Sequence, residues 1–131
     1  MKIDHVGIAV SDIEQALQFY QVALGLPVEG IVDVPDQEVR VAFLPTGESN
    51  IELVQPSTET SGTAKFIEKR GEGIHHICLQ VEDIDAALAQ LKANGVPLID
   101  QEPCSGAHGR VAFVHPRGTH GVLLELVEHA G

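Results

Sequence analysis

Four residues of the chain are of types that bind divalent metals, and they occur as two matching pairs. His5 lies seventy-one positions before His76, and Glu52 lies seventy-three positions before Glu125. Two imidazoles and two carboxylates suit a first-row ion such as Co, Mn, Ni, Fe or Zn, and in a six-coordinate site they leave two positions for substrate or water. Each glutamate is flanked by aliphatic residues, where a buried carboxylate is costly unless it is paired or bound to metal. The four residues therefore predict one metal site.

The two pairs arise from an internal duplication. The stretch HVGIAVSDIEQAL at 5–17 is matched by HICLQVEDIDAAL at 76–88, and RVAF recurs at 40–43 and 110–113. The offset changes along the repeat, so the loop before the last strand is longer in the second half. An approximate twofold relation between the halves would bring the two His–Glu pairs together.

The first half predicts the order βαβββ. Alternating residues at 3–10 predict a strand, Ser11 or Asp12 caps the helix that follows, and Gly25 stands where a helix ends. Three short strands are expected at about 28–34, 39–44 and 50–54. The buried stripe expected for the helix is Ile13, Ala16, Leu17, Tyr20 and Leu24.

The second half predicts the same order. A strand at 74–81 leads to a helix that is capped by Asp83 and ended by Asn94-Gly95. The remaining strands are expected near 98–102, 110–115 and 121–128. The apolar stripe of this helix is Ile84, Ala87, Leu88 and Leu91.

These patterns predict the α+β class, with two tandem βαβββ modules forming a curled sheet around the metal site. We expect a single domain over 1–131, with modules at about 1–55 and 73–131. The linker at 56–72 is polar, but Ala64, Phe66 and Ile67 among charged residues predict a short helix within it.

Composition limits the classes of partner and compartment. The chain has 131 residues and a net charge of -11, which argues against nucleic acid and anionic membranes as partners. It contains no apolar run near the ~20 residues that span a bilayer and no signal-peptide pattern. Cys78 and Cys104 lack a CxxC spacing and are expected as reduced thiols. We therefore expect a soluble, cytoplasmic protein.

The other histidines differ from the four candidate ligands. His75 adjoins His76, and strand alternation sends their side chains to opposite faces. His108 lies in the glycine-flanked loop GAHG at 106–109, where it either reaches a ligand or is an ordinary loop residue. The histidines without a repeat partner are His115, His120 and His129.

The duplicated His and Glu positions resemble the vicinal oxygen chelate (glyoxalase-like) superfamily over nearly the whole chain. That group includes glyoxalase I, extradiol dioxygenases and methylmalonyl-CoA epimerases. The strings that look most like the methylmalonyl-CoA epimerase family are HVGIAV at 5–10, GIHHIC at 73–78, GAHG at 106–109, VHP at 114–116 and GVLLEL at 121–126. The resemblance implies an isomerase that interconverts (R)- and (S)-methylmalonyl-CoA by proton transfer through a metal-stabilised enolate. It also implies an acyl-CoA substrate and a homodimer.

The resemblance also implies roles for single residues. Glu125 carries over as a metal ligand and as a proton-transfer candidate. Glu52 replaces a glutamine ligand of some relatives, so it serves as ligand, base or both. A glutamate proposed as base on the third strand of at least one relative corresponds here to Val41, which Glu38 precedes by an odd number of residues.

For the coenzyme A portion, the sequence offers only scattered cations, and each is more simply a solvated surface charge. They are Lys65, Lys69, Arg70, Arg110 and Arg117. No residue is assigned to a further cofactor.

Two other functions remain open. A glyoxalase I-like lactoylglutathione lyase uses the same ligand set and similar enolate chemistry. A metal-free small-molecule-binding module of the same fold would not need the four ligand residues together. An extradiol dioxygenase fits less well, because it requires two histidines and a single carboxylate.

Overall fold

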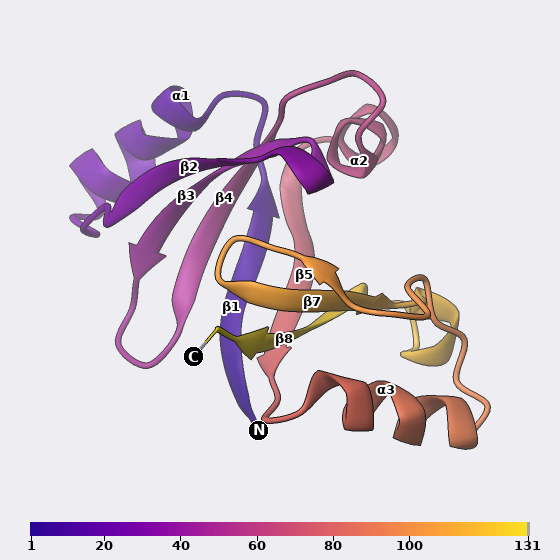
Figure 1. The fold of residues 1–131 in the computed structure, drawn as a ribbon. Coiled ribbons are helices and arrows are strands. Elements are labelled where there is room, and N and C mark those ends of the chain that lie inside the picture. Colours follow the sequence, from indigo (N-terminus) through magenta and orange to yellow (C-terminus); the bar gives the residue numbers. More distant parts are fainter. Residues whose placement is uncertain (131) are drawn as a thin grey trace. The chain divides into compact units, whose positions relative to one another are not determined.

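The computed structural model describes residues 1–130, which divide into two compact units. One unit is His5–His75, and the other combines Met1–Asp4 with the residues from His76 onward. The chain repeats the order βαβββ, once before and once after the linker (Figure 1). The predicted order of elements is therefore confirmed. Over residues 1–130, no helix has the length and hydrophobicity needed to cross a membrane.

Four strands of the first half lie in the order β2-β3-β4-β1. β1 runs parallel to β4, whereas β3 pairs antiparallel with both β2 and β4. The strands are β1 (Lys2–Ala9), β2 (Gly30–Val34), β3 (Val39–Pro45) and β4 (Asn50–Pro56). A short 3₁₀ turn, η2 (Pro35–Gln37), joins β2 to β3.

The two faces of this sheet have different neighbours. Ala42, Leu44 and Leu53 pack with helix α1 (Ile13–Leu17). Alternation places Val41 and Val54 on the opposite face, in a second buried cluster. We call this opposite side the inner face.

The second half repeats the arrangement, with the strand order β5-β8-β7-β6. Helix α3 (Ile84–Ala93) packs on one face with Ala112 and Leu126. Cys78, Val111 and Val127 lie on the other, inner face. The strands are β5 (Gly73–Gln80), β6 (Cys104–Ser105), β7 (Gly109–Val114) and β8 (Leu124–His129), and η3 (Pro116–Gly118) precedes β8.

The first helix differs from its prediction after one turn. Asp12 caps α1, but the helix continues as the π-helix η1 (Gln18–Ala23) before Gly25 takes a left-handed φ of 89°. A π-helical turn holds more residues than an α-helical turn, so the buried stripe rotates out of register. Tyr20 still packs against the core, whereas Leu24 is 56% exposed. The prediction that Leu24 is buried was therefore wrong.

The prediction of a strand near 98–102 was also wrong. Leu98 makes only an isolated bridge with Val114, and the edge strand is instead β6. The Asp100 carboxylate accepts a hydrogen bond of 2.8 Å from the Phe113 N–H, which places a side chain where a ladder partner would stand. The last strand is shorter than expected, because Gly121 adopts a φ of 97° in the turn that precedes it.

The linker contains helix α2 (Gly62–Arg70), as expected. Ser61 caps it by accepting a hydrogen bond of 3.0 Å from the Ala64 N–H. The helix packs against β4, and its Phe66 ring meets His75 edge-on at 4.9 Å.

Candidate metal centre

The first half holds His5 and Glu52 side by side on its inner face. They come from the neighbouring strands β1 and β4, where Gly7 is the partner of Glu52 in the ladder. His5 Nδ1 and Glu52 Oε2 are 3.0 Å apart, and the two side chains are only 8% and 7% exposed. A parallel strand pair thus brings an imidazole and a carboxylate together out of water.

The second half holds His76 and Glu125 on the equivalent pair of strands. They come from the parallel strands β5 and β8, with Cys78 as the ladder partner of Glu125. His76 Nε2 and Glu125 Oε1 are 3.1 Å apart, and the side chains are 7% and 5% exposed. The Phe113 ring meets the His76 ring edge-on at 5.8 Å and helps to fix its orientation.

Both pairs fit the ligands of a divalent ion. Two donor atoms that each lie about 2.1 Å from an ion, at right angles to one another, are about 3.0 Å apart. The observed separations of 3.0 and 3.1 Å match this spacing. Buried carboxylates beside imidazoles are also a donor set that suits first-row metals.

The inner faces around the pairs are apolar. Val41, Phe43 and Val54 are buried on the first sheet, and Val111 and Val127 on the second. Such walls exclude water and strengthen electrostatic interactions within each half-site.

Val41 leaves the third strand without a base. It is 4% exposed in the apolar cluster of the inner face. Glu38, just before the strand, takes a left-handed φ of 56°, and its Oε1 accepts hydrogen bonds from the Thr58 and Thr60 hydroxyls. Glu38 is therefore held by the linker.

Four of the five remaining histidines have structural contacts, and the fifth, His120, takes a left-handed φ of 61°. His75 packs on Phe66, which agrees with its predicted orientation away from His76. His108 stacks on His129, and His129 Nε2 lies 2.6 Å from Asp4 Oδ1. Nδ1 of His115 accepts the Arg117 N–H at 3.0 Å.

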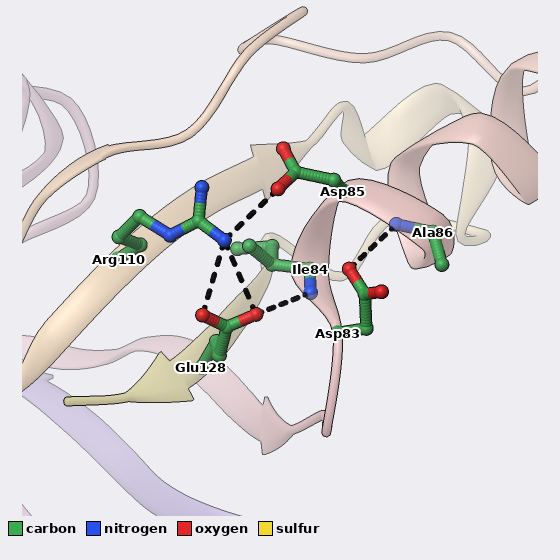
Figure 2. A network of polar contacts seen from close by, with 6 residues as sticks. All are labelled: Asp83, Ile84, Asp85, Ala86, Arg110 and Glu128. Atoms are coloured by element: carbon green, nitrogen blue, oxygen red, sulfur yellow. Dashed lines mark hydrogen bonds and ion pairs between the residues drawn. The ribbon is translucent and has the colours of Figure 1, made fainter. Parts of the chain in front are cut away.

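Arg110 belongs to an ion-pair network that fixes the start of α3 (Figure 2). Its guanidinium donates to Asp85 at 2.9 Å and to Glu128 at 3.0 Å. The hydrogen bond with Asp85, followed by that with Glu128, raises the pKa of Arg110 above its ordinary value. Glu128 Oε1 also accepts the Ile84 N–H at 3.0 Å.

The same cap recurs in the first half, and sequence reasoning missed it. Gln55 Oε1 accepts the Ile13 N–H at 2.9 Å, as Glu128 does for Ile84. The repeat could have revealed it, because the two capping residues occupy equivalent places. Gln55 follows Val54, and Glu128 follows Val127, in the last strand of each half.

Comparison with known proteins identifies the family. A model described as the Glyoxalase/Bleomycin resistance protein/Dioxygenase superfamily matches residues 4–113. The chain belongs to this superfamily.

Full-length relatives narrow the similarity within the superfamily. An ethylmalonyl-CoA/methylmalonyl-CoA epimerase of Cereibacter sphaeroides is 44% identical over 128 residues, covering 95% of this chain and 96% of that protein. The structure of a hypothetical protein of Bacillus halodurans is 50% identical, with a TM-score of 0.96, and covers 99% of this chain and 95% of that one. A Streptomyces coelicolor methylmalonyl-CoA epimerase variant, in complex with 2-nitronate-propionyl-CoA, is 38% identical with a TM-score of 0.95. That match covers 100% of this chain and 96% of the other.

These similarities confirm two predictions. The α+β vicinal oxygen chelate fold is confirmed, and so is the likeness to methylmalonyl-CoA epimerases. His5, His76 and Glu125 are buried candidate ligands within this fold.

Proposed function

We propose that the chain is a metal-dependent methylmalonyl-CoA epimerase. The observation that carries the proposal is the pair of buried His–Glu half-sites at repeat-equivalent positions. Full-length relatives named as epimerases of methylmalonyl-CoA support the choice of reaction. The complex of one relative with an acyl-CoA compound supports an acyl-CoA substrate.

In this proposal His5, Glu52, His76 and Glu125 hold one divalent ion, which is Co, Mn, Ni, Fe or Zn. When bound, the ion supplies electrophilic stabilisation for the negative charge that develops on the thioester oxygen. In this proposal the two imidazoles serve only as ligands, each through a ring nitrogen.

The two glutamates move the proton. One of them enters as a carboxylate and takes the proton from the carbon between the thioester and the carboxylate of the substrate. The other enters as a carboxylic acid and delivers its proton to the opposite face of that carbon. One C–H bond breaks and another forms, so the products differ only in configuration, and the roles of Glu52 and Glu125 are exchanged.

The apolar inner faces assist this transfer. Since Val41 occupies the third-strand position and Glu38 is bound by Thr58 and Thr60, Glu52 is the remaining carboxylate of the first half's inner face suited to be the second base. Dry walls around it keep water from protonating the enolate before the second glutamate does.

A three-substrate comparison tests the proposal. Purified protein loaded with Co²⁺ is given (R)-methylmalonyl-CoA, (S)-methylmalonyl-CoA, or methylglyoxal with glutathione. We expect interconversion of the first two, with solvent deuterium at the reacting carbon, and loss of activity after chelation. Turnover of the hemithioacetal alone would establish the lactoylglutathione lyase instead.

Two further outcomes concern metal and assembly. Tight binding of a small molecule without turnover or metal affinity would establish the binding module. We also propose a homodimer, and light scattering that gives the mass of a single chain would contradict it.

A further inference from the structure

Basic side chains gather on helix α2 in an otherwise acidic protein. The chain has eight Lys and Arg residues and a net charge of -11, and three of the eight lie on this nine-residue helix. Lys65, Lys69 and Arg70 are all exposed, and Glu68 is the only acid of the helix. The helix is therefore a local positive region.

Three other cations of the chain have partners within it. Arg40 pairs with Glu14, Arg110 pairs with Asp85 and Glu128, and Lys92 donates to the Gln101 carbonyl. In contrast, Lys65, Lys69 and Arg70 form no ion pair with any carboxylate of residues 1–130. Their charge is available to an anion from outside the chain.

The helix is attached to the strands that carry candidate ligands. It packs against β4, which holds Glu52, and Phe66 contacts His75, whose side chain points away from that of His76. The Arg70 guanidinium lies over the Phe66 ring at 5.8 Å, so that ring connects a cation to the start of β5. Glu72 accepts the Ser11 N–H at 2.7 Å, which fixes the chain just after the helix.

We propose that α2 binds the phosphate groups of the coenzyme A substrate, an inference that rests on the proposed function. Coenzyme A carries a diphosphate and a 3′-phosphate, and its pantetheine arm separates them from the thioester. A strongly acidic protein repels such a polyanion unless it presents a local positive region. Lys65 and Lys69, four residues apart, share one face of α2 and provide two adjacent ammonium groups.

The test measures binding of free coenzyme A by calorimetry, with the double substitution Lys65→Gln and Lys69→Gln. Each exposed charge contact contributes about two- to fivefold in affinity. We expect Kd to rise about tenfold at low ionic strength and the difference to shrink in high salt, where screening is nearly complete. Arg70 is left unchanged, because it also contacts Phe66.

A matched control removes two lysines elsewhere, by Lys2→Gln and Lys92→Gln. This control should leave the affinity for coenzyme A nearly unchanged. An equal loss in both double variants would show a general charge effect and overturn the inference. An unchanged Kd in the α2 variant would also overturn it.

Kinetics separate this inference from the proposed function. Methylmalonyl-pantetheine lacks all the phosphates, so its kcat and KM should be the same in wild type and in the α2 variant, while KM for methylmalonyl-CoA rises. A rise in KM for both thioesters would assign α2 to a structural role. If wild type epimerises neither thioester, the proposed function fails, and the calorimetric comparison still decides whether α2 binds phosphates.

Discussion

The two halves of the chain are alike on their inner faces. They differ in their helices and in the residues that cap those helices. On both inner faces a histidine of the first strand lies beside a glutamate of the last, at 3.0 and 3.1 Å. The same valine positions border both pairs, Val41 with Val54 and Val111 with Val127.

The supports have diverged around these pairs. The first helix turns into a π-helix, whereas α3 is regular throughout. The helix cap is a neutral Gln55 in the first half and a charged Glu128 in the second, where Arg110 neutralises it. The residues that form the half-sites therefore differ less between the two halves than the residues that form and cap the helices.

The largest expected effect comes from the carboxylates. Glu52→Gln and Glu125→Gln should each lower the rate of epimerisation about 100- to 10,000-fold, because an amide oxygen can remain beside the histidine but accepts no proton. Each variant should still exchange the reacting proton of one substrate enantiomer with D₂O, through the base that remains. Mass spectrometry of each enantiomer measures this exchange.

The two variants serve as controls for one another. If one variant loses exchange with both enantiomers while the other variant keeps both, one glutamate handles both faces of the carbon. The functional equivalence of the halves would then be wrong, although the equivalence of their strand positions would stand.

Core leucines at equivalent positions should give the next largest effect. Leu53 and Leu126 are 0% and 3% exposed and pack under α1 and α3 respectively. Truncation by Leu53→Ala or Leu126→Ala should cost about 2–5 kcal/mol of unfolding free energy, measured with urea. A loss below 1 kcal/mol in only one variant would show that the halves are not equally packed.

The helix caps should give a smaller effect. Gln55→Ala and Glu128→Ala each remove the acceptor of a helix-starting N–H, which should cost about 1 kcal/mol. Glu128→Ala should cost more, because Arg110 also loses a partner. Amide exchange at Ile13 and Ile84 locates each loss, and faster exchange at both sites in both variants would contradict separate caps.

The smallest effect is expected from Glu128→Gln, which turns the second cap into the kind found in the first. The amide oxygen still accepts from Ile84, so only the charge interaction with Arg110 is lost. The drop in melting temperature should be less than half of that caused by Glu128→Ala and should vanish at high salt. A drop as large as that caused by Glu128→Ala would mean that the ion pair with Arg110, rather than the hydrogen bond from the Ile84 N–H, holds the start of α3.

The duplication made much of this arrangement predictable. Strand alternation, with caps at Asp12 and Asp83, was enough to predict both βαβββ orders, and the matched His and Glu positions predicted the pairs. Local patterns could not show the π-helical turn, because Leu24 fits an α-helical stripe equally well. Local patterns also did not predict the edge strand β6. The hydrogen bond from the Phe113 N–H of β7 to the Asp100 carboxylate depends on a tertiary contact, which a local pattern does not show.

We propose that the two half-sites together hold one ion, and Co²⁺ binding tests this directly. Metal-free wild type, His5→Ala and His76→Ala are titrated with Co²⁺, and the number and affinity of bound ions are measured. We predict one ion per chain in the wild type and a large loss of affinity when either histidine is removed. Two ions per wild-type chain, or one variant with unchanged affinity, would contradict the account.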